Sequence, residues 1–132
     1  MGSGYLSFWP QAAVLAFVEG DPVGDTKYIY SRVLPTNGFT EVVYQFEVFE
    51  KIINTDASTI TVTPEISNDG INWQTQTGDA STAVSWASSY PTKEVKKVST
   101  IAAFMRFRIA LFDGDTDTPV GGTIQIVGTG RT

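Results

Sequence analysis

The sequence predicts an all-β protein: a single-domain antiparallel β-sandwich of about seven to nine short strands with an extended N-terminal arm. Its length of 132 residues suits one domain with one core. Three segments alternate apolar and polar residues with a period of two, which indicates strands with one buried face. Turn-forming residues separate these and several weaker segments, as is typical of sandwiches. We assign the arm and first strand to residues 1–18 and the sandwich to residues 19–132.

The clearest strand patterns span Thr40–Phe49, Thr59–Ser67 and Ala103–Phe112. Each segment is rich in the β-branched and aromatic residues that favour strands. Each is expected to bury one face and to leave the other in contact with solvent. The residues expected to face inward are Val42, Tyr44, Phe46, Val48, Ile60, Val62, Pro64, Ile66, Met105, Phe107, Ile109 and Leu111. Those expected to face outward include Gln45, Glu47, Thr59, Thr61, Thr63, Glu65, Arg106 and Arg108.

Pro64 lies inside the second of these strands, although proline has no N–H to donate to a neighbouring strand. The strand is therefore expected to lie at a sheet edge or to carry a bulge at this residue. An open edge can pair with another chain. A solvated or self-protected edge is the alternative.

Weaker strand patterns occur between turn signals, of which Asn68-Asp69-Gly70 is the strongest because Asp-Gly favours a hairpin. A single helical turn is possible near Ser99–Ala103. The weaker strand candidates are Ala12–Val18, Thr26–Leu34, Ala83–Trp86, Glu94–Val98 and Gly122–Gly128. The other turn signals are Gly20-Asp21-Pro22, Pro35-Thr36-Asn37-Gly38, Asn54-Thr55-Asp56, Gly78-Asp79 and the segment Asp113–Gly122.

The N-terminal arm is unusually aromatic, since chain termini are commonly loose and polar. Tyr5, Phe8 and Trp9 are therefore candidate anchors that pack on a protein surface. That surface is either this domain's own sheet or a neighbouring subunit. If the arm binds a neighbouring subunit, removal of residues 1–10 should abolish binding and leave the sandwich folded.

The formal net charge is 9 − 14 = −5, which argues against general affinity for nucleic acid or anionic membranes. Residues 93–108 are an exception, with five basic residues against Glu94 alone. This segment is either a solvated basic face or a contact with an acidic protein. Arg106 and Arg108 are the candidate interface residues in it.

The chain has no cysteine and no histidine, which excludes disulfides, thiolate nucleophiles, zinc fingers and histidine-based catalytic or metal sites. Glu47 and Glu65 could face each other across neighbouring strands, but nothing indicates a pocket that would make them an acid–base pair. No glycine-rich phosphate loop follows a strand. We therefore expect neither enzymatic activity nor a cofactor.

Asp113, Asp115 and Asp117 have a spacing that could place oxygen ligands around calcium. An EF-hand loop that began at Asp113 would need glycine at the sixth position and glutamate at the twelfth. Thr118 and Ile124 occupy these positions, so a solvated loop is the favoured interpretation and no metal is expected. A calcium-dependent adhesion domain is a third functional alternative, which added calcium would stabilise.

Trp73 and Trp86 are expected to pack in the core, with Trp73 closing it beneath the hairpin. The alternative is that Trp9, Trp73 and Trp86 stack on sugar rings, as aromatic residues do in carbohydrate-binding sandwiches. No targeting signal or membrane-spanning segment is evident, because the apolar run Gln11–Val18 is short and no basic residue precedes it.

The order of motifs from about residue 40 to residue 130 resembles small β-sandwich proteins encoded in the structural modules of tailed phages and prophages. The motifs are Thr61–Trp73 with its Ser-Asn-Asp-Gly-x-x-Trp ending, the strand Phe104–Ile109 with alternating arginines, and the final strand Gly121–Gly128. The first motif also resembles hairpins of discoidin-like and other carbohydrate-binding sandwiches.

This resemblance implies a non-enzymatic virion structural protein, most simply a capsid decoration (cement) subunit that binds the capsid lattice. The implied partners are the major capsid protein or another virion protein, with homo-oligomers in the assembly and no nucleic acid or membrane. The implied location is the virion, after synthesis in the host cytoplasm. A carbohydrate-binding module and a tail-associated receptor-binding component are the alternatives.

Overall fold

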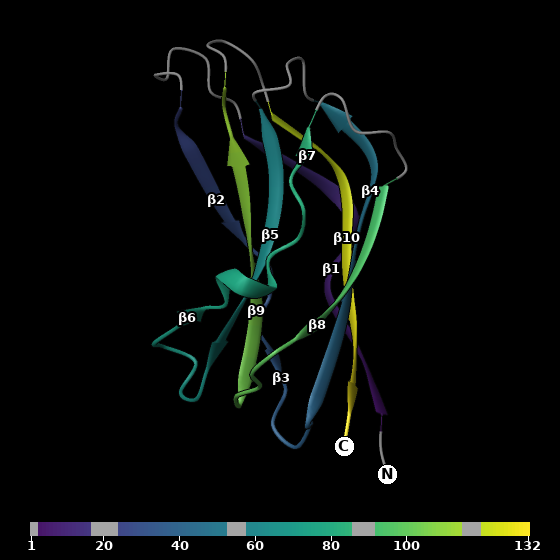
Figure 1. Cartoon of the computed structure of the whole chain (residues 1–132), viewed down its shortest axis with the longest axis vertical. Coiled ribbons are helices and arrows are strands. Elements are labelled where there is room, and N and C mark those ends of the chain that lie inside the picture. Colours follow the sequence, from purple (N-terminus) through teal and green to yellow (C-terminus); the bar gives the residue numbers. More distant parts are fainter. Residues whose placement is uncertain (1–2, 17–23, 53–57, 86–91, 115–119) are drawn as a thin grey trace.

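Two antiparallel β-sheets face each other in the computed structural model of the chain (Figure 1). The structure describes residues 3–16, 24–52, 58–85, 92–114 and 120–132. The first sheet has the strand order β1 (Ser3–Ala16), β10 (Val120–Arg131), β4 (Glu41–Ile52), β8 (Thr92–Val98). The second has the order β2 (Thr26–Tyr30), β9 (Phe104–Phe112), β5 (Thr59–Ser67), β6 (Gln74–Thr75), with β3 (Leu34–Pro35) on β9 and β7 (Val84–Ser85) on β5.

This arrangement confirms the predicted antiparallel sandwich. The described residues form ten strands, slightly more than expected, because the two-residue strand β6 was not predicted and the single candidate Thr26–Leu34 divides into β2 and β3. The weaker strand candidates overlap β1, β2 with β3, β7, β8 and β10. The turn signals at Gly20-Asp21-Pro22 and Asn54-Thr55-Asp56 lie outside the described residues, as does Trp86.

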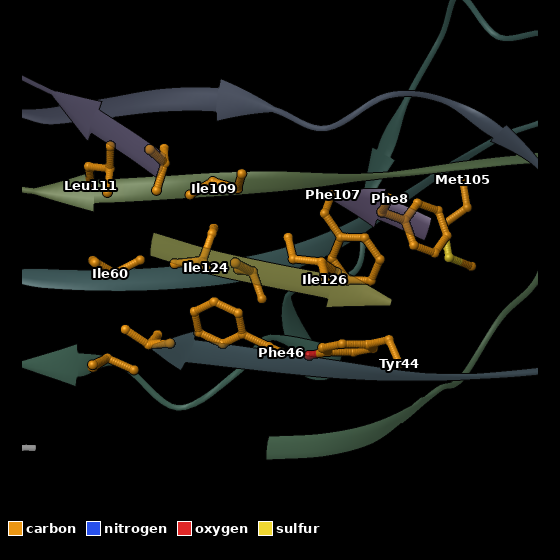
Figure 2. Close-up of a cluster of buried hydrophobic side chains, with 14 of the residues drawn as sticks. Phe8, Tyr44, Phe46, Ile60, Met105, Phe107, Ile109, Leu111, Ile124 and Ile126 are labelled. Carbon is orange, nitrogen blue, oxygen red and sulfur yellow. The ribbon is translucent and has the colours of Figure 1, made fainter. Parts of the chain in front are cut away.

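The core lies between the sheets and contains the side chains that alternation placed inward. All of the expected inward residues on β4, β5 and β9 are buried. Figure 2 shows the centre of this cluster, where the rings of Phe8 and Tyr44 approach Phe107 from two sides. Their centroids lie 4.8 and 4.7 Å from that of Phe107, both in edge-to-face geometry. Such pairs add to the stabilisation from burial alone.

Besides its ring contact with Phe107, Tyr44 makes a hydrogen bond in the core. Its hydroxyl donates to the backbone carbonyl of Asp79 at 2.6 Å. Burial raises the pKa of this hydroxyl well above its ordinary value. The Asp79 carboxylate accepts hydrogen bonds from the amide and the hydroxyl of Ser99. Asp79 therefore joins the segment after β6 to the first sheet.

The outward face of β5 is not solvated as expected. Thr63, Glu65 and Ser67 are each only 4% exposed, because side chains of the neighbouring strands and the β5–β6 loop cover them. The expectation of an exposed edge or a bulge at Pro64 is also wrong, since β5 pairs with β9 without a register shift from Thr59 to Ser67. Instead, the Pro64 carbonyl accepts a hydrogen bond from Gln76 between β6 and β7.

The N-terminal segment is strand β1 of the sandwich. It pairs with β10 from Ser3 opposite Arg131 to Ala16 opposite Val120, with register shifts around Trp9. The arm therefore packs within this domain's own sheet, which is one of the two surfaces that the sequence left open. Leu6 and Phe8 are core residues, so removal of residues 1–10 is now expected to destabilise the sandwich.

No helical turn forms at residues 99–103. The backbone there makes hydrogen bonds to other segments: the Ala103 carbonyl accepts from Thr36 and Asn37, and the Ala102 carbonyl accepts from the Thr36 hydroxyl. The one helix in the described ranges is the short 3-10 helix η1 (Thr77–Asp79), at the predicted turn Gly78-Asp79.

The predicted hairpin turn at residues 68–70 joins β5 to β6, with Gly70 at a φ of +75° that favours glycine. The carboxylate of Asp69 accepts hydrogen bonds of 2.8 Å from the backbone amides of Ile71 and Asn72. These bonds, with others from the side chains of Asn72 and Ser67, hold the pKa of Asp69 well below its usual range.

We expect Asp69 to make the stability of the sandwich depend on pH in the acid range. A carboxyl group whose pKa is lower in the folded state stabilises the fold above its unfolded pKa of about 3.9. That contribution falls as the pH drops from there through the folded pKa. Urea denaturation should show wild type more stable than Asp69→Asn at pH 5, with the difference shrinking towards pH 2. Glu50→Gln, at an exposed position, is the control; an unchanged Asp69→Asn difference would contradict the prediction.

Candidate protein-contact surface

The outer face of the second sheet gathers aromatic and arginine side chains. Tyr28 and Tyr30 come from β2, Arg106 and Arg108 from β9, and Trp73 from the β5–β6 loop. The register places Tyr30 opposite Arg108, and the inward residues of β9 direct both arginines outward. We call these five residues the tyrosine–arginine face.

Arg106 is held firmly on this face. Its guanidinium lies 4.2 Å from the ring centre of Tyr30 and 4.3 Å from that of Trp73. Its Nε donates a hydrogen bond of 2.8 Å to Glu65, whose other carboxylate oxygen accepts one of 2.7 Å from the Thr75 hydroxyl. The Glu65 side chain is 5% exposed and that of Arg106 22%. The charge of Arg106 is therefore matched within the chain.

Trp73 does not close the core as expected. It is partly buried on the outer side of the sheet, where it covers Arg106. The sequence carried a signal for this position, because alternation on β9 placed Arg106 outward and arginine stacks on tryptophan more readily than on other rings. The sequence does not indicate that the β5–β6 loop brings Trp73 over β9.

Arg108 is held in a different way. Its guanidinium lies 4.6 Å from the ring centre of Tyr28, and its Nε is buried with no hydrogen-bond acceptor. Within the described part of the chain, no carboxylate pairs with it. Tyr28 and Tyr30 beside it are 50% and 44% exposed. The face therefore combines fixed aromatic rings with an unneutralised arginine.

The basic segment 93–108 does not form one patch. Its lysines lie on β8 at an edge of the first sheet, whereas its arginines lie on β9 in the second. Lys97 pairs with Glu41 at 3.3 Å, and Lys96 donates a hydrogen bond of 2.7 Å to the carbonyl of Ala80. The interpretation of these residues as one continuous basic face is therefore wrong.

The N-terminal candidate residues are separated from the tyrosine–arginine face. Phe8 is 1% exposed and belongs to the core, so it is not a free anchor. Trp9 is partly buried against the core, and its indole N–H donates to the Ala12 carbonyl at 3.3 Å. Tyr5 is 71% exposed, and it lies on the outer face of the first sheet. A contact role for Tyr5 remains a prediction.

The acidic candidates do not form a reaction centre or metal site within the described ranges. Glu47 lies on β4 and Glu65 on β5, in different sheets, so the idea that they face each other across neighbouring strands is wrong. Asp113 is buried, and Asp115 and Asp117 lie outside the described residues. No group of three or more potential metal ligands occurs among the residues described. The described residues also include no helix long and apolar enough to cross a membrane.

A hollow of about 270 Å³ lies where β7 approaches β4 and β8. Its described lining contains one acid, Glu94, whose carboxylate already accepts a hydrogen bond of 2.7 Å from the Thr82 amide. The other lining residues include Phe46, Val84 and Lys93. The hollow therefore lacks the paired acids that glycoside chemistry would require.

No protein-family model matches the sequence, and no curated protein matches it. Solved structures do match. One is a chain in the structure of infectious bursal disease virus, strain Gx, with a TM-score of 0.61 and 8% identity over 97% of this chain and 31% of that one. The corresponding values for strain Gt are 0.59, 8%, 98% and 32%. The present chain thus spans less than a third of the length of those chains.

At this identity, the two matches show a shared β-sandwich fold. They support the coarser expectation of a fold found in virus particles, and they do not support a tailed-phage origin in particular. A third structure, of TmCBM61 in complex with β-1,4-galactotriose, matches with a TM-score of 0.40 and 5% identity. That score is too low to indicate a common fold.

Proposed function

We propose that this chain is a non-enzymatic structural protein of a virus particle, which binds the capsid lattice as a decoration subunit. The observation that carries the proposal is the fold likeness to the infectious bursal disease virus chains, which extends over nearly the whole chain at a TM-score of 0.61. A decoration subunit needs a rigid body with contact surfaces and no reaction centre. Repeated weak contacts on a lattice then give strong overall binding.

The tyrosine–arginine face supports a protein-contact role. Tyrosine, tryptophan and arginine are enriched at protein interfaces and supply most of the residues that dominate binding energy. Here the rings of Tyr28 and Tyr30 already contact arginine side chains. Fixed side chains lose little conformational freedom on binding. The face is therefore suited to contact a neighbouring protein.

Electron microscopy of particles from the native source tests the proposal. Gold-labelled antibodies raised against this protein should decorate intact particles, and mass spectrometry of the same gradient fraction should contain the chain. Labelling over the head supports a decoration subunit, whereas labelling confined to the tail supports a tail-associated component. Absence of the chain from purified particles would overturn a virion role of either kind.

We expect Tyr5→Ser to weaken particle binding and to leave the stability of the sandwich nearly unchanged. Tyr5 is 71% exposed, and surface substitutions of this kind usually change stability by less than about 0.5 kcal/mol. Co-sedimentation with particles that lack this protein measures the first effect, and urea denaturation measures the second. Ser3→Ala, at an exposed position of the same strand, is the control. Binding equal to wild type would remove Tyr5 from the contact surface.

A carbohydrate-binding module is the second candidate, and the exposed rings of Tyr28 and Tyr30 are the observation that favours it. Titration with a panel of glycans distinguishes the two functions. Trp73 lies against Arg106 on the same face, so its fluorescence should report a glycan that binds there. A saturable change with one glycan would favour the carbohydrate-binding function, and no change would favour the structural one.

A further inference from the structure

Two arginines on the same face of β9 differ in whether a carboxylate of this chain neutralises them. Arg106 has a carboxylate partner in Glu65 at 2.8 Å. Arg108, two residues further along, has none among the described residues, and its Nε is buried without an acceptor. A buried donor without an acceptor is destabilising. The contrast therefore requires an explanation specific to Arg108.

The surroundings of Arg108 fit a carboxylate from outside the chain. The guanidinium lies over the ring of Tyr28. Because its Nε is buried, a carboxylate from outside would bind the two terminal nitrogens, which can donate parallel hydrogen bonds. The half-exposed Tyr28 and Tyr30 flank it with apolar rings and hydroxyl groups. The arginine–carboxylate pair already present between Arg106 and Glu65 shows that the second sheet accommodates this chemistry beside aromatic rings.

We propose that an acidic segment of a partner protein docks on the outer face of the second sheet and places a carboxylate on Arg108, between Tyr28 and Tyr30. This inference deepens the proposed function by naming the chemistry of the partner. It assigns Arg106 to the architecture of the face and Arg108 to recognition.

The charge pattern favours an acidic protein over nucleic acid. The chain carries a net charge of −5, and the lysines of β8 lie in the other sheet. A nucleic acid needs several cations along one surface to neutralise successive phosphates. One unneutralised arginine between exposed tyrosines instead fits a single carboxylate with apolar neighbours, as at the centre of a protein interface.

Nuclear magnetic resonance titration of the full ¹⁵N-labelled chain tests this inference at low ionic strength. The probe is a hexaglutamate peptide, and the readouts are the amide signals of β2 and β9 together with the Nε–H signal of Arg108. These signals should shift saturably. Arg108→Gln should weaken binding at least tenfold. Lys97→Gln, which removes an exposed charge from the other sheet, should leave it within twofold of wild type.

Three other results would overturn the inference. The first is the absence of shifts on β2 and β9, and the second is equal weakening by Lys97→Gln and Arg108→Gln. The third is tighter binding of a decathymidine oligonucleotide, or of inorganic phosphate at equal concentration, at the same signals. The spectrum of Arg108→Gln also reports whether the variant is folded, and Arg108→Lys, which keeps the charge without the planar fork, should bind with intermediate affinity.

The outcome is separable from that of the proposed function. Particles that contain the chain while the peptide fails to bind would refute only the acidic-partner inference. Peptide binding by a chain that is absent from purified particles would refute the virion role and leave the recognition chemistry of Arg108 in place.

Discussion

Phe8→Ala is expected to destabilise the sandwich by about 3–5 kcal/mol, the usual loss when a buried phenylalanine is truncated. Phe8 is 1% exposed and its ring packs edge-to-face against Phe107, as Figure 2 shows. The substitution removes this contact and leaves a cavity beside β9. Because typical domains are stable by only about 5–15 kcal/mol, this single change would remove a large part of the total.

Urea denaturation followed by circular dichroism measures the effect as a lower midpoint with an unchanged slope. Tyr5→Ala is the matched control, since Tyr5 belongs to the same strand and is 71% exposed. It should shift the free energy of unfolding by less than about 0.5 kcal/mol. A Phe8→Ala protein as stable as wild type would mean that β1 is a detachable arm and that the sandwich closes without it.

The sequence contained a signal for the structural role of β1. Leu6 and Phe8 alternate with Ser7, which is the same period of two that identified the other strands. The aromatic residues of the arm indicated that it packs on a surface, since termini are commonly loose and polar, but they did not indicate which surface. The pattern was hard to follow because Pro10 interrupts it and the register of β1 against β10 shifts around Trp9.

Alternation predicted the long strands and their inward faces because each depends on residues close together in the sequence. The order of strands in the sheets depends on contacts between distant segments, which alternation does not encode. Lys97 and Arg106 are nine positions apart, yet they lie in different sheets. The outward face of β5 was expected to be exposed to solvent for the same reason. Nothing close to Glu65 in the sequence indicates that Arg106 covers it.

The candidate site was predictable to a similar extent. The outward positions of Arg106 and Arg108 follow from the period of β9. Their different environments do not, because these depend on which tyrosine, tryptophan or carboxylate the neighbouring strands and loop bring into contact. The distinction between a structural arginine and a recognition arginine therefore required the three-dimensional arrangement.

The pair formed by Arg106 and Glu65 provides the other large expected effect. Arg106→Met should destabilise the sandwich by about 2–4 kcal/mol, because it leaves the almost fully buried Glu65 carboxylate without its cation. The estimate lies below that for a fully buried pair, since the Arg106 side chain is 22% exposed. Glu65→Met should be milder, because the arginine keeps its stacking on Tyr30 and Trp73.

A double-mutant cycle separates pairing from packing. Replacing both residues by methionine removes the uncompensated charge and leaves an apolar pair of similar length, so the double variant should be more stable than Arg106→Met alone. The free energies of unfolding from urea titrations give the coupling energy directly. If the two single losses simply add, Arg106 stabilises the face through its stacked rings alone. Its charge would then be as free for a partner as that of Arg108, and the assignment of separate roles to the two arginines would fail.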